Sequence, residues 1–200
     1  MDTGCVSYQK PRSQNDYKDL IWSLAPLVLI CLVIAGIASQ CSFSTGGPKQ
    51  GKIPDFNAKA ALTDDAHLMS FPIRLPALPD TDPNKWTPNS GSHDTITGNG
   101  GGDTSTVGYI TPEGTYMQLT QSNATVEALA KKYAPSHSST ATGTQQHGGH
   151  MWSIYAEQGA EPAWITDFGD VRVLIKGAGN GAAFDTLATA VGQAQPLPRD

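Results

Sequence analysis

No cysteine follows position 41, because the three cysteines of this 200-residue chain are Cys5, Cys31 and Cys41. The segment beyond them cannot form an internal disulfide, so its stability must come from a packed core. Residues 64–192 are long enough for such a core, since a domain of about 130 residues buries about two-thirds of its unfolded surface. We therefore expect one cooperative domain without disulfide bonds.

Basic residues are few in the same segment. Residues 64–192 contain six Lys or Arg and thirteen Asp or Glu, which gives a net charge of −7. A nucleic-acid-binding protein needs a basic surface that displaces counterions from the phosphate backbone. The sequence therefore predicts no nucleic-acid partner.

Signatures of catalysis are also missing. The chain has no G-x-S-x-G motif, and the stretch GNGGGD (98–103) lacks the Lys and the Ser or Thr of a phosphate-binding loop. The adjacent acids Asp64 and Asp65 fall at the start of a predicted helix, where the helix dipole explains them. We predict that the protein is not an enzyme and has no cofactor.

The segment VRVLIKGAGNGAAF (171–184) imitates a dinucleotide-binding turn, with Gly177, Gly179 and Ala182 between a strand and a helix. That site needs a second parallel strand, which brings an acidic residue to the ribose. Only eight residues follow Gly192, and two of them are prolines. The pattern thus favours a turn and a helix cap.

A long apolar run is present near the N-terminus. Residues 20–39 contain no charged side chain, and a helix of about 20 residues spans about 30 Å of hydrocarbon. We predict a transmembrane helix there. The alternatives are a cleaved signal peptide, whose apolar region is shorter, and a lipoprotein signal at Cys41, where Gln40 replaces the expected small residue.

Basic residues flank this run on both sides, and those before it lie closer to its end. This arrangement favours a cytoplasmic N-terminus and a C-terminal domain outside the cytoplasm, in the cell membrane as a single-pass protein. We expect a cytoplasmic tail at 1–19, the transmembrane helix at 20–39, a flexible tether at 40–63, the extracytoplasmic domain at 64–192 and a disordered tail at 193–200.

Residues 109–119 (YITPEGTYMQL) and 164–174 (WITDFGDVRVL) agree at four of eleven positions. Each stretch predicts a hairpin with a glycine in its turn, followed by a helix with apolar residues at i, i+3, i+4 and i+7. The first helix contains Val126, Leu129 and Tyr133, with Asn123 as cap; the second begins after Asn180 and stops at Gly192. We predict an α+β domain in two layers, with an antiparallel sheet and both amphipathic helices on one face.

The segment HGGH (147–150) predicts a further hairpin. If Gly148 and Gly149 form its turn, His147 and His150 face each other with Cβ atoms about 5 Å apart, close enough to share a metal ion. Zinc needs at least three protein ligands, and His137 is the nearest further histidine in the sequence. A polar hairpin tip is favoured, and a metal-assisted hydrolase built on these histidines is the alternative.

Five motifs follow one another in this order: WTP (86–88), GYITPEGTYMQLTQS (108–122), the Trp152 and Tyr155 pair, EPA (161–163) and the helix from 184 to 191. Together they resemble the bacterial envelope proteins of domain-of-unknown-function family 4245. The resemblance covers residues 18–192 and implies one N-terminal membrane helix and this topology, but no activity.

The predicted function is a non-enzymatic binding or accessory module of the cell envelope, and a small-molecule or lipid-binding module is the alternative. The predicted partners are the bilayer, through residues 20–39, and an envelope protein or ligand. On the sheet face opposite the helices, Gln118 points the same way as Tyr116, and Arg172 the same way as Lys176. A face that mixes aromatic and polar groups suits a contact of modest affinity, so we expect these four residues to bind the partner.

Overall fold

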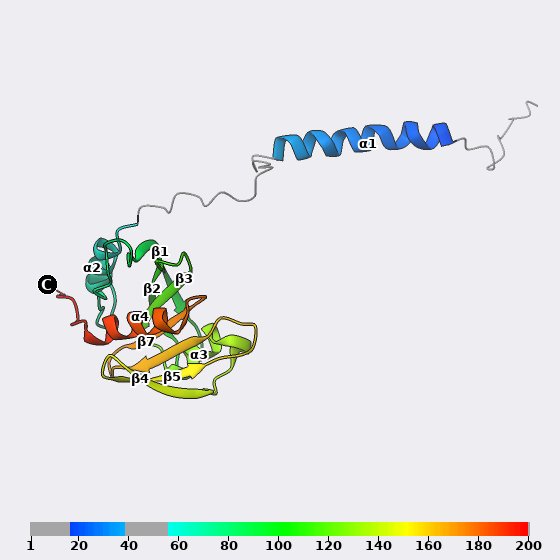
Figure 1. Cartoon of the computed structure of the whole chain (residues 1–200). Coiled ribbons are helices and arrows are strands. Elements are labelled where there is room, and N and C mark those ends of the chain that lie inside the picture. The colour runs from blue at the N-terminus through cyan, green and yellow to red at the C-terminus, as the bar shows by residue number, and fades with distance from the viewer. Residues whose placement is uncertain (1–16, 39–55, 200) are drawn as a thin grey trace, which may run out of the picture. The chain divides into compact units, whose positions relative to one another are not determined.

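The computed structural model describes residues 17–38 and 56–199, which belong to two compact units. The first unit contains one helix, α1 (Tyr17–Ala38), which begins three residues before the predicted apolar span 20–39 and includes all of that span except residue 39 (Figure 1). Among the described residues, no helix has both the length and the apolarity that crossing a membrane requires. Most of the predicted cytoplasmic tail, and the predicted tether up to residue 55, lie outside the described residues.

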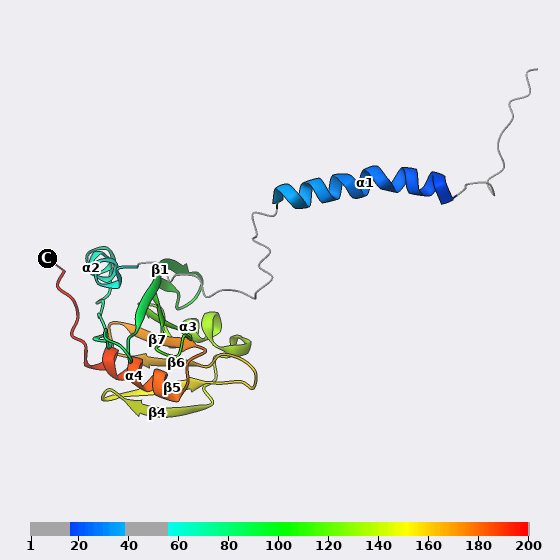
Figure 2. The same cartoon turned by 45° about the horizontal axis from the view of Figure 1, so that its top comes forward.

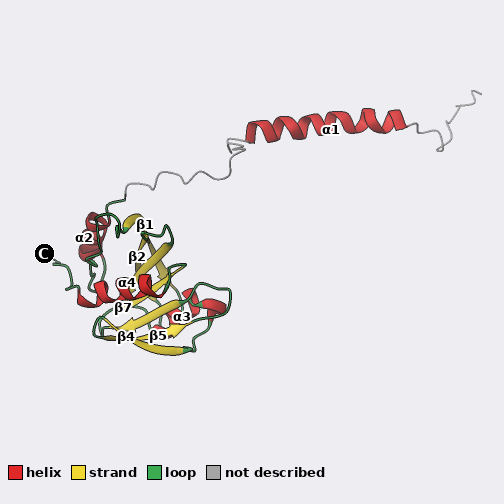
Figure 3. Cartoon of the chain, in the orientation of Figure 1, coloured by secondary structure: helices red, strands yellow, loops and turns green. Residues whose placement is uncertain are grey.

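The second unit is built on one seven-stranded antiparallel sheet in the order β1-β2-β3-β7-β6-β5-β4 (Figure 3). The strands are β1 (Thr87–Ile96), β2 (Gly102–Ile110), β3 (Tyr116–Ser122), β4 (Gly143–His147), β5 (His150–Tyr155), β6 (Ala163–Asp167) and β7 (Arg172–Gly177). The helices are α2 (Ala58–Leu68), α3 (Val126–Tyr133) and α4 (Gly181–Gln193), and a short 3-10 helix, η2, spans Pro135–His137. The predicted α+β class with an antiparallel sheet is confirmed.

The helices do not share one face of the sheet, so that part of the prediction is wrong. Helices α2 and α4 pack on one face, in a core cluster that includes Leu62, Trp152 and Leu187. Helix α3 packs on the other face, in a second cluster that includes Leu129 and Ile165. The domain therefore has three layers, with strands between α3 and α4 (Figure 1, Figure 2).

The two copies of the sequence repeat close their hairpins in different registers. Tyr109 pairs with Met117, whereas Trp164, fifty-five positions after Tyr109, pairs with Ile175. An equivalent hairpin would pair Trp164 with position 172, so the second hairpin is shifted by three residues. The loops cause this difference: one is closed by a bond from Thr111 N–H to the Thr115 carbonyl, the other by a bond from Phe168 N–H to the Val171 carbonyl.

An odd shift in register turns each following side chain to the opposite face of a sheet. The repeated leucines show this effect, because Leu119 belongs to the cluster under α4 and Leu174 belongs to the cluster under α3. In each copy of the repeat, the helix that follows the hairpin packs on the sheet face opposite to the repeated leucine: α3 lies opposite to Leu119, and α4 lies opposite to Leu174. Since the leucines point opposite ways, the two helices lie on opposite faces.

Both ends of the predicted domain extend further than expected. Helix α2 begins at Ala58, inside the predicted tether, because Asn57 caps it by accepting a bond from Ala60 N–H at 3.0 Å. At the other end, Leu197 N–H donates to the Ile73 carbonyl at 2.8 Å, so part of the predicted disordered tail pairs with the proline-rich segment, residues 71–88. That segment packs on the same face as α4, with Phe71 and Ile73 buried.

Candidate ligand-binding site

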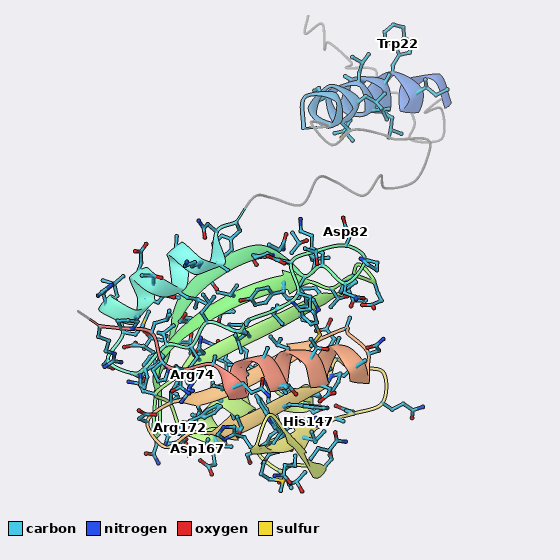
Figure 4. The ribbon with its side chains drawn as sticks, turned by 60° about the vertical axis from the view of Figure 1, so that its left-hand side comes forward. Trp22, Arg74, Asp82, His147, Asp167 and Arg172 are labelled. Carbon is cyan, nitrogen blue, oxygen red and sulfur yellow. The ribbon has the colours of Figure 1, made fainter. Side chains whose placement is uncertain are left out.

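The predicted histidine hairpin forms, and its turn has the expected geometry. Gly148 and Gly149 both have positive φ, and His147 pairs directly with His150. The two rings have other partners: His147 Nδ1 lies 2.6 Å from Asp185 Oδ1 (Figure 4), and the His150 ring lies 4.2 Å from that of Phe168. Among residues 17–38 and 56–199, no three His, Cys, Asp or Glu side chains are grouped to hold a metal ion.

His137, the third candidate ligand, belongs to the η2 turn beyond α3. Its Nδ1 lies 2.8 Å from the Lys131 carbonyl, so it contacts the end of α3. His147 also stacks on Trp164, with ring centroids 4.9 Å apart. These contacts place the hairpin tip against α4 and the sheet as a packing element.

The four residues predicted to bind a partner all project from the face that carries α3, since they occupy alternate positions of β3 and β7. Gln118 and Lys176 are direct cross-strand neighbours. Lys176 Nζ donates to the Tyr133 carbonyl at 2.9 Å, at the end of α3. Arg172 Nε lies 3.3 Å from Asp167 Oδ2 in an ion pair without hydrogen-bond alignment (Figure 4). Both cations thus have partners inside the domain, and Tyr116 remains the exposed aromatic of the four.

A hollow of about 510 Å³ opens on the other face, between the start of α2, the proline-rich segment and the strands β1 and β2. We call it the Tyr109 hollow. Its lining combines aromatic and aliphatic side chains with a comparable amount of polar surface: Phe56, Asn57, Ala58, Lys59, Leu75, Pro76, Ala77, Leu78, Asp80, Trp86, Pro88 and Tyr109. Pockets that take small molecules have this size.

Two aromatic residues are fixed deep in this hollow. Tyr109 is 3% exposed and Trp86 is 6% exposed, and their rings meet edge to face with centroids 6.4 Å apart. The Trp86 backbone is held in place, because its N–H donates to the Pro79 carbonyl at 2.8 Å. The lining is therefore preformed by the fold.

The Tyr109 hydroxyl is buried and has no hydrogen-bond partner among the described residues. Burial raises the pKa of this phenol well above its usual value, so the group stays protonated at neutral pH. A buried polar group without a partner costs about 1 to 3 kcal/mol, which is why such groups are rare in native proteins. The packing around the Tyr109 ring encloses this hydroxyl, which has almost no accessible surface in the hollow.

A second hollow, of about 330 Å³, lies beside the first, between α2 and the strands β1 and β2. Phe56 lines both hollows, and its ring covers Gly91, where an added Cβ would come within 2.4 Å of the Phe56 ring. Asp65 and His93 lie at this second hollow and are 2.6 Å apart, and Ser105 Oγ donates to the other Asp65 oxygen at 2.5 Å.

These contacts correct the interpretation of Asp65, which lies in the second half of α2 and is 4% exposed. Because α2 begins earlier than predicted, Asp65 is far from the helix start and faces the sheet. Its carboxylate stands between the histidine and the serine, so the imidazole does not contact the serine hydroxyl as nucleophilic catalysis requires. The arrangement joins α2 to the sheet.

The sequence pattern marked Trp86 only within the WTP motif and did not select Tyr109 as a binding residue. The only signal for the hollow was the cluster of prolines near Trp86, which keeps that segment free of helix and strand. The hollow forms because α2 and the proline-rich segment pack against β1 and β2 without closing the space between them. No local sequence pattern contains this information.

No curated protein and no solved structure matches the chain. A family model described as protein of unknown function (DUF4245) matches residues 12–191, which include α1 and most of the domain. The match therefore covers nearly the whole chain, and the protein belongs to the DUF4245 family.

Proposed function

We propose that this protein is a membrane-anchored, non-enzymatic binding module of the bacterial cell envelope, and that it holds a small ligand in the Tyr109 hollow. One observation carries the proposal: the fixed rings of Trp86 and Tyr109 line a hollow of about 510 Å³, a size that suits a small molecule. A ligand in this hollow gains apolar contact with the aromatic rings and polar contact with Asn57, Lys59 or Asp80.

The lining residues favour binding over catalysis. None of the described residues around the hollow is a serine, cysteine or histidine, the usual sources of a nucleophile or a general base. The titratable groups are Lys59, Asp80 and Tyr109, and the phenol is held in its neutral form. This composition suits recognition without bond breaking.

The anchor is proposed from the uncharged run at 20–39, with the N-terminus in the cytoplasm and the domain outside. The exposed side chains of α1 support it, because Trp22, Leu27, Leu29 and Leu32 present large apolar surfaces. Such surfaces need an apolar environment, and a bilayer supplies one. The domain would then work close to the membrane surface.

The proposal can be tested by filling the hollow without removing core atoms. Ala77 is exposed and lines the hollow, so Ala77→Trp places an indole in the space that a ligand would take. The full-length protein is purified from its own membranes, and small molecules that copurify are identified by mass spectrometry. We expect a molecule that accompanies the wild type and is lost from Ala77→Trp. The matched control is Ala160→Trp, at an exposed alanine in the turn between β5 and β6, and it should retain the molecule.

A protein contact on the α3 face is a second candidate, favoured by Tyr116, which is 37% exposed. Its ring lies over Gly108, where an added Cβ would be 2.4 Å from the Tyr116 hydroxyl. Crosslinking in intact membranes tests this candidate: Tyr116→Ala should remove a crosslinked partner that Ala77→Trp leaves in place. Loss of the partner in both variants would count against a separate protein surface.

A further inference from the structure

We infer that the outer edge of β4 is a self-association surface, at which two copies of this chain join their sheets. The two β4 strands lie antiparallel about a twofold axis at Gln145, so that Thr144 of one copy faces Gln146 of the other. The surface is separate from the Tyr109 hollow and gives the protein a partner that the proposed function does not include.

β4 is the last strand of the sheet (Figure 3). Within the described parts of the chain, no strand pairs with its outer side. The other edge strand, β1, is protected, because Pro88 removes a backbone donor, a bulge follows it and the Phe56 ring covers Gly91. Neither a proline nor a register shift occurs in β4, so its outer side is open to a further strand.

The register of the hairpin shows which backbone groups of β4 point outward. His147 and His150 close the two-residue turn, and bonded and non-bonded pairs alternate from there along the ladder. Thr144 and Gln146 therefore direct their N–H and C=O groups away from β5. In agreement, the carbonyl of Met151, which lies opposite Gln146, accepts a bond from a threonine of β6. An antiparallel partner centred on Gln145 would make four backbone bonds to these groups.

Charge selects a second copy as the partner. Residues 133–156, which include β4 and β5, contain no Asp, Glu, Lys or Arg and form the longest such run in the domain. Residues 64–192 carry a net charge of −7, so copies of the domain repel one another on average. At β4 this repulsion is absent, and a peptide of either charge would find no counter-charge along the strand.

The side chains also match across the axis. On one face, Thr144 lies opposite Gln146 of the second copy, and these uncharged polar groups can bond to each other. On the other face, His147 lies opposite Gly143, where no atom lies within 4 Å of an added Cβ, so the imidazole has room. Met151, the neighbour of Gln146 on β5, is 57% exposed and borders the contact.

The contact is small. Each copy contributes five strand residues, whereas a stable interface takes about 20 to 30 residues a side. Copies that diffuse freely would therefore associate weakly. The proposed anchor confines copies to one membrane and raises their effective concentration, so the dimer is expected there.

The register is tested by oxidative crosslinking of the full-length protein in the membranes of the cells that produce it, with its three native cysteines replaced by serine. Gln145→Cys should form a disulfide-linked dimer, because residues on the axis have Cα atoms about 4.5 Å apart, within disulfide reach. Thr144→Cys should crosslink at least about fivefold less, because its two copies lie about 9 Å apart. Ser92→Cys, at an exposed position of β1, is the control at the other edge.

Complementary positions give a second test. Thr144→Cys and Gln146→Cys, each weakly crosslinked alone, should crosslink with each other when two differently tagged proteins are produced together. In the Gln145→Cys protein, Thr144→Lys with Gln146→Lys should reduce the dimer about fivefold, since lysines then stand opposite lysines. Thr144→Lys with Gln146→Glu is the matched control and should keep the dimer, since opposite charges meet. Circular dichroism establishes that each variant is folded.

The inference is overturned if Gln145→Cys gives no dimer, if Thr144→Cys or Ser92→Cys crosslinks equally well, or if the two charged variants give equal yields. None of the substituted residues lines the Tyr109 hollow, so the outcome is independent of the result for Ala77→Trp. The anchor is checked separately, since protein without an anchor is absent from the membrane fraction.

Discussion

Asp65 Oδ1 lies 2.6 Å from His93 Nε2, and this contact joins a buried carboxylate of α2 to the edge strand β1. The other oxygen of Asp65 accepts a bond from Ser105 on β2. One carboxylate thus connects α2 to two strands, in the wall of the second hollow.

We expect Asp65→Ala to lower the free energy of unfolding by about 2 to 4 kcal/mol, because it leaves the Ser105 hydroxyl buried without its partner and opens a space under α2. Urea denaturation followed by circular dichroism measures the change. The neighbouring acid Asp64 is exposed on the same helix, and Asp64→Ala should change stability by less than about 0.5 kcal/mol. Equal effects at the two positions would show that the buried network adds nothing.

The placement of α3 and α4 on opposite faces makes two core leucines energetically independent. Leu129 and Leu187 are both fully buried, in different clusters. Each Leu→Ala change should cost about 2 to 5 kcal/mol, and the double variant should cost the sum to within about 0.5 kcal/mol. Thermal and urea denaturation of the three variants measure these values. Coupling well above that limit would contradict the separation of the two clusters.

Lys176 should matter more for stability than its position on a polar face suggests. Its Nζ satisfies the Tyr133 carbonyl at the end of α3, so Lys176→Met should lower the free energy of unfolding by about 1 to 2 kcal/mol. Lys131 is exposed in the same last turn of α3, and Lys131→Met serves as the control with a change near zero. If both variants unfold like the wild type, Lys176 is free to bind a partner as the sequence predicted.

The ion pair between Asp94 and Lys132 predicts a pH dependence. The hydrogen bond from Lys132 lowers the pKa of the Asp94 carboxyl, so the stabilisation is present above the ordinary carboxyl pKa and is lost as pH falls through the lower folded-state value. The same hydrogen bond raises the pKa of Lys132, so the stabilisation is present below the ordinary lysine pKa and is lost as pH rises through the higher folded-state value.

The stability difference between the wild type and Lys132→Met should therefore be constant between about pH 5 and pH 9 and should shrink at both extremes. Because the Asp94 side chain is exposed, salt should reduce the difference. Denaturation at a series of pH values and at two ionic strengths measures it. A difference that persists unchanged at pH 2 would rule out the ion pair as its source.

The proposed topology predicts opposite reactivity for two thiols. In intact cells, Cys5 should resist a membrane-impermeant maleimide, and Cys41 should react, since they lie on opposite sides of the uncharged run. Labelled protein is detected by mass spectrometry, with permeabilised cells as the control in which both react. Labelling of Cys5 alone in intact cells would reverse the orientation.

The sequence by itself determined the local elements. Gly114 and Gly169 adopt φ of 80° and 97° in the two hairpin turns, and the pair Gly148-Gly149 forms the predicted two-residue turn. Asn180 caps α4 as expected, accepting a bond from Ala183 N–H at 2.9 Å, and α3 ends just before Pro135. Each of these features depends on a residue and its near neighbours, so a short pattern contains the necessary information.

Other local predictions failed where a distant residue intervened. Asn123 does not cap α3, because its side chain accepts a bond from Asp103 N–H and Thr125 is the cap. Gly192 does not end α4, which continues to Gln193; an added Cβ at Gly192 would lie 2.8 Å from the Gly148 carbonyl oxygen. This glycine permits close approach of the β4–β5 turn, a requirement that its own neighbours do not reveal.

Only the tertiary structure decided which face each helix covers, where Asp65 is buried and that Tyr109 lines an open hollow. The first depends on the parity of a hairpin register, since one residue more or less in a turn reverses the face of every side chain that follows. The second and third depend on how α2 packs against β1 and β2, which brings together residues far apart in the chain. Burial and free space are properties of that packing, and the sequence pattern around Tyr109 is the same whether its hydroxyl has a partner or not.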